Sequence, residues 1–168
     1  DLYGGTYRLF TRLYKDSGIK FHFVDMNDFE KFESLINENT KLVWVETPTN
    51  PLMKLADIAA IAKITKKHNI LFAVDNTFAT PYLQQPINYG ADLVIHSATK
   101  YMDGQGRVLG GITVGSKQLI NEIYLFGRLT GPSLSPFNAW VLSKSMETLY
   151  VRMDKHAENA MFIAKSLE

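Results

Sequence analysis

Three short apolar runs, with helical spacing of apolar residues between them, constrain the fold of this chain more than any other feature. The runs cover residues 42–45, 70–74 and 93–95. A strand that is apolar throughout, rather than at alternate positions, is typical of a parallel sheet covered by helices on both faces. Residues 100–108 are too few for a crossover helix, so the next strand, near 109–114, should run antiparallel. We therefore expect a three-layer α/β/α fold whose mostly parallel sheet carries one antiparallel strand.

Two further elements are predicted from local patterns. Phe21 and Phe23 alternate with polar neighbours, which favours a strand over residues 20–25. The dipeptide SP at 135–136 is a typical helix start, and apolar residues recur at near-heptad spacing from there to the end of the chain. We expect one long helix over residues 136–168, and a coiled coil is the alternative for this segment. The length of 168 residues is enough for a buried core and predicts a single domain.

The charge and residue composition argue against several classes of function. The 18 Lys and Arg residues nearly balance the 17 Asp and Glu residues, so a net charge of +1 indicates no nucleic-acid partner. The absence of cysteine removes disulfides, thiolate nucleophiles and cysteine zinc sites, and it fits a cytoplasmic protein. The four histidines are scattered without ligand spacing, so we expect no metal site. No apolar run approaches the length of a membrane span, so we expect no membrane partner.

Polar side chains follow each apolar run, at the end where a parallel sheet binds ligands. They are Glu46 and Asn50 after the first run, Asp75 and Thr77 after the second, and Ser97, Thr99 and Lys100 after the third. A carboxylate directly after a buried strand is costly unless a cation meets it. Lys100 lies in a polar turn just past the end of a buried strand, where we expect it to be desolvated, which favours the neutral amine that attacks carbonyls. A solvated lysine in a surface loop is the alternative.

One cofactor needs this combination of a lysine, a carboxylate and hydroxyl groups. Pyridoxal 5′-phosphate (PLP) forms a Schiff base with a lysine, pairs its pyridinium nitrogen with a carboxylate and binds hydroxyls through its phosphate. Other motifs are not met. Residues 104–106 (GQG) lack the third glycine of the dinucleotide fingerprint and precede a strand. The chain also has neither a phosphate-loop motif nor a G-x-S-x-G elbow.

Four short motifs occur in a distinctive order along the chain. They are YGGT at 3–6, ETPTNP at 46–51, VDNT at 74–77 and HSATKY at 96–101. In order and spacing they resemble the Cys/Met-metabolism family of PLP-dependent enzymes, and the resemblance runs over essentially the whole chain. Within that family, DGQGR at 103–107 and the stretch 131–140 are most similar to O-succinylhomoserine sulfhydrylases.

The resemblance implies a role for each candidate residue. Lys100 would form the Schiff base and transfer protons, and Asp75 would pair with the pyridinium nitrogen. Ser97 and Thr99 would bind the phosphate. The others would lie beside the cofactor: Tyr3, which would stack on the ring and serve as an acid–base group, Asn50, Glu46 and Thr77. Each of these has a structural alternative, since Asn50 and Thr77 also suit turns, Glu46 could accept structural hydrogen bonds, and Tyr3 could simply pack.

The resemblance also implies an architecture and an assembly. Residues 1–168 would be the large, cofactor-binding domain of a fold type I enzyme, without the family's N-terminal segment and C-terminal domain. Residues 136–168 would lead to that C-terminal domain. The full-length enzyme would be a cytoplasmic homotetramer, a dimer of dimers, that acts on a small amino-acid substrate.

The implied reaction is γ-replacement, in which O-succinyl-L-homoserine and sulfide give homocysteine and succinate in methionine biosynthesis. Cystathionine γ-synthase and cystathionine or methionine γ-lyase activities are alternatives, because the cofactor motifs do not report which nucleophile enters. Arg107 either presents a cation that favours an acidic leaving group or forms a salt bridge within its loop. A non-enzymatic alternative is that the chain is an inactive structural module.

Overall fold

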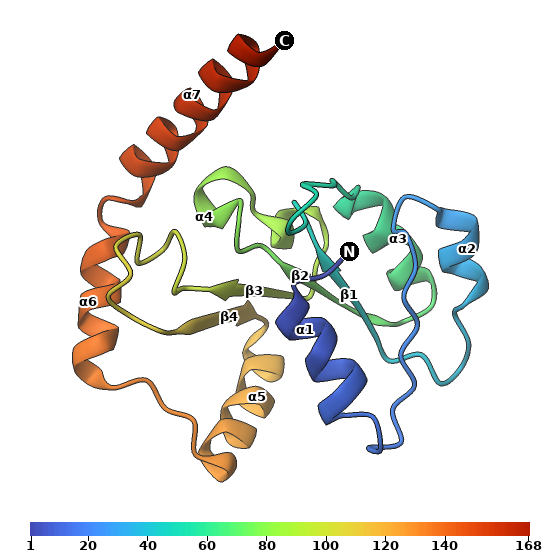
Figure 1. The fold of residues 1–168 in the computed structure, drawn as a ribbon. Coiled ribbons are helices and arrows are strands. Elements are labelled where there is room, and N and C mark those ends of the chain that lie inside the picture. The colour runs from blue at the N-terminus through green and yellow to red at the C-terminus, as the bar shows by residue number, and fades with distance from the viewer. The chain divides into compact units, whose positions relative to one another are not determined.

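The computed structural model describes residues 1–168, and Figure 1 labels its helices and strands. In chain order the elements are α1 (Gly4–Arg8), the π-helix η1 (Leu9–Leu13), α2 (Phe29–Ser34), β1 (Leu42–Glu46), α3 (Ile58–Lys67), β2 (Leu71–Asp75), α4 (Thr80–Leu83), the 3₁₀-helix η2 (Pro86–Tyr89), β3 (Leu93–Ser97), β4 (Gly111–Gly115), α5 (Lys117–Thr130), α6 (Pro136–Met146) and α7 (Leu149–Leu167). The chain forms two compact units. The first comprises Asp1–Asn76 and Pro86–Val94, and the second comprises Thr77–Gln85 and Ile95–Glu168.

The first unit is built on the parallel pair of β1 and β2. The register of this pair aligns Glu46, at the end of β1, with Asp75, at the end of β2. α3 connects the two strands, and the Asp57 side chain caps it by accepting a hydrogen bond from Ala60 N at 2.9 Å. The parallel pairing predicted from the apolar runs is confirmed, and it brings the carboxyl ends of two strands to one edge of the sheet.

The core of the first unit consists of side chains from α2, α3, β1 and β2, together with Val94 of β3 and two residues of connecting segments. Its buried residues are Phe32, Val43, Val45, Ile58, Ile61, Ala62, Ile70, Phe72, Val74, Ala91 and Val94. Burial of one large aliphatic or aromatic side chain contributes about 1.5–3 kcal/mol. The continuous burial of Phe72, Ala73 and Val74 along β2 explains why this strand is apolar on both faces.

The sheet has four strands in the order β1-β2-β3-β4. Within the second unit the chain reverses after β3, where Thr99 N donates a hydrogen bond to Gly110 O at 3.2 Å. Gly110 N donates in return to Thr99 Oγ1 at 3.0 Å. β4 therefore runs antiparallel to β3, and the predicted α/β class with one antiparallel strand is confirmed.

The second unit has a smaller core, and serine side chains cap two of its helices, α5 and α6. Its buried cluster comprises Ala98, Met102 and Leu142, with Ile112 and Met146 packed against it. The Ser135 hydroxyl accepts a hydrogen bond from Asn138 N at 3.1 Å and caps α6, with Pro136 at the first position of the helix. The helix start predicted at residues 135–136 is confirmed.

The strand predicted for residues 20–25 is wrong, because this segment forms neither a strand nor a helix. Phe21 stacks on Phe10 with ring centroids 4.9 Å apart, and Phe23 lies 5.0 Å from the Tyr7 ring. The alternating phenylalanines thus pack against the aromatic residues of α1 and η1. A segment that packs on a helix can place every second side chain toward it, as a strand does toward one face of a sheet, so the alternating pattern does not distinguish the two.

The single helix predicted for residues 136–168 is divided into α6 and α7, although a long terminal helix is confirmed by the 19 residues of α7. The break lies at residues 147–148, and the Ser145 carbonyl beside it accepts side-chain hydrogen bonds from Thr148 Oγ1 at 3.1 Å and Arg152 Nη2 at 3.0 Å, as well as a backbone hydrogen bond from Thr148 N at 3.3 Å. The two side-chain donors add to the backbone hydrogen bond at a carbonyl near the end of α6, where intrahelical partners run out.

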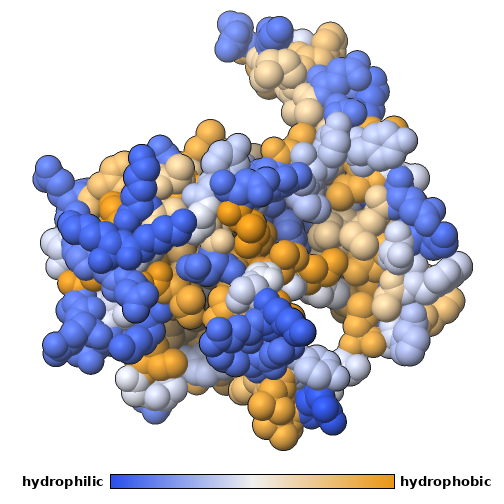
Figure 2. All heavy atoms as spheres, turned by 180° about the vertical axis from the view of Figure 1, so that it is seen from behind, coloured by the Kyte–Doolittle hydropathy of each residue, from blue (hydrophilic) through white to orange (hydrophobic).

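Hydrophobic side chains also reach the surface, as the orange areas in Figure 2 show. α5 buries none of its residues, and Tyr124, Leu125 and Phe126 are each more than half exposed. Part of the apolar surface of α5 is therefore exposed in this chain. None of the helices has both the length and the apolar character needed to cross a membrane.

Candidate active site

Glu46 brings together two other predicted site residues of the first unit. It is buried at 6% exposure, and its carboxylate accepts two backbone hydrogen bonds. Tyr3 N donates to Oε2 at 2.6 Å, and Asn50 N donates to Oε1 at 2.7 Å. Asn50 lies in a turn, as its structural alternative predicts. One carboxylate therefore ties the start of α1 and the loop after β1 to the end of this strand.

The end of the β1–β2 pair is acidic. Burial raises the pKa of Glu46 above its ordinary value of 4.5, while hydrogen bonds from Tyr3 and Asn50 lower it in part and the charge of Asp75 raises it further. Asp75 is half-buried and in register with Glu46. Two neighbouring carboxyl groups at the ends of adjacent strands attract a cationic partner, such as a protonated ring nitrogen.

The ring of Tyr3 is held close to the backbone of α1. A Cβ atom at Gly5 would lie 2.4 Å from Tyr3 Cε1, so only glycine leaves room for the ring in this position. The Tyr3 side chain is nevertheless 48% exposed. With its backbone fixed by Glu46 and its ring beside Gly5, Tyr3 presents an ordered aromatic surface on which a planar ligand could stack.

In the second unit, three hydroxyl residues surround the turn after β3. Ser97 N donates to Thr77 Oγ1 at 2.8 Å. The Thr99 hydroxyl both accepts from Gly110 N at 3.0 Å and donates to Gly110 O at 3.3 Å. Thr77 and Thr99 therefore shape this turn through backbone bonds, in addition to any role toward a ligand.

Lys100 lies in the same turn, and its side chain is exposed. The desolvation expected from its sequence position is therefore wrong for this chain. The predicted position in a turn just past the strand is correct, since β3 ends at Ser97, but this turn leaves the lysine exposed within the chain. Lys100 N donates to Ser97 O at 3.1 Å, which places the amine-bearing residue beside two hydroxyl residues.

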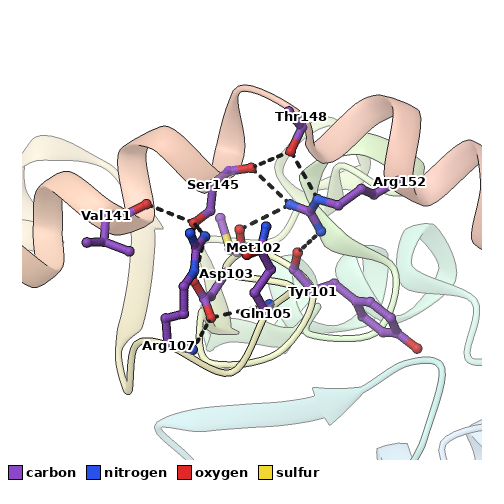
Figure 3. A network of polar contacts seen from close by, with 9 residues as sticks. All are labelled: Tyr101, Met102, Asp103, Gln105, Arg107, Val141, Ser145, Thr148 and Arg152. Atoms are coloured by element: carbon purple, nitrogen blue, oxygen red, sulfur yellow. Dashed lines mark hydrogen bonds and ion pairs between the residues drawn. The ribbon is translucent and has the colours of Figure 1, made fainter.

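A buried polar network follows the lysine turn, and apart from a salt bridge of Arg107 within its loop it was not predicted from the sequence (Figure 3). Asp103 is 0% exposed, and its carboxylate accepts hydrogen bonds from Arg107 N at 2.7 Å, Ser145 Oγ at 3.1 Å and Gln105 N at 3.4 Å. Arg107 Nη2 donates to Ser145 Oγ at 2.6 Å and lies 3.3 Å from Asp103 Oδ1. Of the two alternatives for Arg107, the structure has the loop salt bridge.

The charge of Asp103 is stabilised inside this network. Burial alone would raise its pKa, but hydrogen bonds from Arg107 N, Ser145 Oγ, Gln105 N and Val108 N outweigh burial and hold the pKa below the ordinary value of 3.8. The spacing of Asp103 and Arg107 was a signal in the sequence. Ser145, which is 42 residues from Asp103, gave none.

The predicted site residues thus form two local groups. The first unit contains Tyr3, Glu46, Asn50 and Asp75, and the second contains Thr77, Ser97, Thr99 and Lys100. Hydrogen bonds or strand register link the members of the first group, and the turn after β3 links those of the second.

Sequence comparison finds relatives that match nearly the whole of this chain. The chain is 50% identical to a Bacillus subtilis (strain 168) protein named cystathionine gamma-synthase/O-acetylhomoserine (thiol)-lyase, with 100% of this chain and 45% of the relative covered. It is 48% identical to the O-succinylhomoserine sulfhydrylase of Pseudomonas aeruginosa, with 99% of this chain and 41% of the relative covered. The chain thus spans less than half the length of these relatives.

Solved structures agree with the sequence matches. A crystal structure of cystathionine gamma-lyase from Lactobacillus plantarum, complexed with L-serine, matches with a TM-score of 0.97 and 42% identity, over 99% of this chain and 44% of that one. The fold is that of fold type I PLP-dependent enzymes. The family model described as Cys/Met metabolism PLP-dependent enzyme matches residues 1–168. The chain belongs to this family.

The residues present fit the family's cofactor. PLP requires a primary amine, a carboxylate for its ring nitrogen and donors for its phosphate. Lys100 offers an exposed amine, Asp75 a half-buried carboxylate, and Ser97 and Thr99 offer hydroxyls.

Proposed function

We propose that the full-length protein binds PLP through the eight residues of the two groups. Lys100 would supply the amine that binds the cofactor's aldehyde, and Asp75 would pair with the ring nitrogen. Ser97 and Thr99 would donate hydrogen bonds to the phosphate, while Tyr3 would stack on the ring. Asn50, Glu46 and Thr77 would complete the surroundings. The observation that carries this proposal is the closed turn after β3, which sets Lys100 directly beside two hydroxyl residues.

Each of these residues would do a distinct task during turnover. When bound, PLP supplies an electron-withdrawing ring that stabilises negative charge at the substrate Cα. The Lys100 amine would take the Cα proton once the substrate amine has replaced it on the cofactor, and would later return a proton. Asp75 would keep the ring nitrogen protonated by its negative charge. Glu46 would keep Tyr3 in place through the 2.6 Å hydrogen bond to its backbone.

We further propose that the reaction is γ-replacement. O-succinyl-L-homoserine and hydrogen sulfide would give L-homocysteine and succinate, with the C–S bond formed at the carbon that loses the ester oxygen. The 48% identity to an O-succinylhomoserine sulfhydrylase supports this choice. A second candidate is cystathionine γ-synthesis, in which cysteine replaces sulfide. It is supported by the 50% identity to a protein whose name includes cystathionine gamma-synthase.

A comparison of kcat/KM for the full-length protein tests the choice. We expect O-succinyl-L-homoserine with sulfide to be converted faster than the same ester with cysteine, and cystathionine or methionine to be cleaved poorly. If cystathionine formation or cleavage exceeds homocysteine formation tenfold, which is about 1.4 kcal/mol in transition-state terms, the sulfhydrylase assignment fails. A Lys100→Ala variant should be inactive with all of these substrates.

A further inference from the structure

The turn that carries Lys100 is closed by backbone hydrogen bonds. They are Lys100 N to Ser97 O at 3.1 Å, Asp103 N to Ala98 O at 2.9 Å and Gly104 N to Lys100 O at 2.8 Å. The last of these fixes the carbonyl of the lysine itself. A displacement of residues 101–104 would therefore displace the backbone of Lys100.

Arg152 of α7 donates hydrogen bonds to two carbonyls of this turn that its backbone hydrogen bonds do not use (Figure 3). Its Nη1 donates to Tyr101 O at 2.6 Å, and its Nη2 donates to Met102 O at 3.3 Å. Nη2 also donates to Ser145 O at 3.0 Å, and Nε donates to Thr148 Oγ1 at 3.2 Å. One guanidinium thus joins the two residues after Lys100 to the junction of α6 and α7.

Gly104 makes room for this guanidinium. Its φ is +73°, and a Cβ atom there would lie 2.3 Å from Arg152 Nη1 and 2.8 Å from Arg152 Cζ. A side chain at this position would therefore displace the arginine. The left-handed backbone and the close approach of Arg152 both require glycine here.

Arginine suits this task, and lysine does not. The acceptors of Arg152 are three carbonyls and a hydroxyl, so its planar fork of donors organises backbone groups instead of pairing with a carboxylate. α7 is itself fixed, since Tyr82 of α4 donates to Asp154 at 2.9 Å. The Tyr101 ring also packs edge-on against His156 of α7, with centroids 5.2 Å apart.

We propose that Arg152 is a positioning residue for Lys100. It holds the 101–104 segment against α7 and thereby fixes where the lysine amine stands relative to the bound substrate. The catalytic part of this inference rests on the proposed function of Lys100. A displacement of about 1 Å of a reacting group can reduce a rate about a hundredfold, so a loosened turn should be visible in kcat.

The first test needs no cofactor. Hydrogen exchange of the Asp103 and Gly104 amides is measured in the cofactor-free protein for wild type, Arg152→Ala and Arg152→Lys. We expect protection of both amides to fall at least tenfold in both variants, because lysine has a single donor nitrogen. Arg128→Ala, which removes an exposed arginine of α5 outside the network, should leave protection unchanged. Unchanged protection in the Arg152 variants would overturn the inference.

The second test uses the cofactor-loaded, full-length protein. We expect Arg152→Lys to lower kcat per bound cofactor at least tenfold while KM stays within about threefold, because uniform substrate binding is unaffected. A merely structural role would lower the yield of folded protein and leave kcat per cofactor unchanged, which would overturn the inference. Failure of the proposed function looks different, since Lys100→Ala would then turn over normally.

Discussion

Replacing Gly104 with alanine should destabilise the protein by more than its backbone angle explains. The φ of +73° costs an alanine about 1–2 kcal/mol. Its Cβ would also force the Arg152 guanidinium away, because the two would approach to 2.3 Å. The hydrogen bonds to Tyr101 O and Met102 O would then weaken or break, and a hydrogen bond from a charged group contributes about 1.5–3 kcal/mol. Because Arg152 is only half-buried and its hydrogen bond to Met102 O is long, we expect the weakening of these two bonds together to add about 1.5–3 kcal/mol to the backbone cost.

Gly106 provides a matched control for this prediction. Its φ is +67°, and a Cβ there would meet nothing within 4 Å, so Gly106→Ala carries the backbone cost alone. Urea unfolding should place Gly104→Ala about 1.5–3 kcal/mol below Gly106→Ala. In an Arg152→Ala background the difference between the two glycine variants should shrink to the small cost of the 3.3 Å approach of the Gly104 Cβ to Tyr101 O. Equal stabilities of the two single variants, within about 0.5 kcal/mol, would refute the contact between Gly104 and Arg152.

Three further predictions concern the acidic edge, the buried carboxylate and the core. Asp75→Ala should slow Cα proton exchange of the full-length protein far more than it weakens cofactor binding, and near wild-type exchange would rule out the proposed pairing with the ring nitrogen. The pKa of Asp103 is lowered in the folded state, so its charge stabilises the fold fully above the ordinary value of 3.8, and this stabilisation is lost as the pH falls through the folded pKa. Urea unfolding at several pH values should therefore show a weaker loss of stability in acid for Asp103→Asn than for wild type. Phe72→Ala should cost about 3–5 kcal/mol, whereas Phe162→Ala, at a site that is 72% exposed, should cost little in the same assay.

The elements that sequence reasoning found are those decided by local pattern. Continuous apolar runs predicted β1 and β2 because both faces of these strands are covered, and Ser135 marked the start of α6 because its hydroxyl caps the first turn. The residues at the strand ends were predicted from the same apolar runs, since a parallel pair brings Glu46 and Asp75 into register.

The features that sequence reasoning missed depend on contacts between distant residues. The break between α6 and α7 is tied to Arg152, two of whose acceptors lie 50 and 51 residues away, and no periodicity encodes those contacts. Lys100 lies in the turn after β3, where the apolar run predicted it, but its exposure depends on which distant residues pack over that turn, and the run does not encode such packing. The strand prediction for residues 20–25 failed because Phe21 and Phe23 pack against aromatic residues of α1 and η1, and this packing produces the same alternation as a strand.

The attachment of PLP to Lys100 is the central claim, and borohydride reduction tests it most directly. The full-length protein is loaded with PLP and reduced, so that the bond between cofactor and amine becomes permanent, and its peptides are then mapped by mass spectrometry. We predict that the pyridoxyl group is found on Lys100 and that Lys100→Ala takes up no stable label. Label on another lysine, with Lys100 unmodified, would contradict the account.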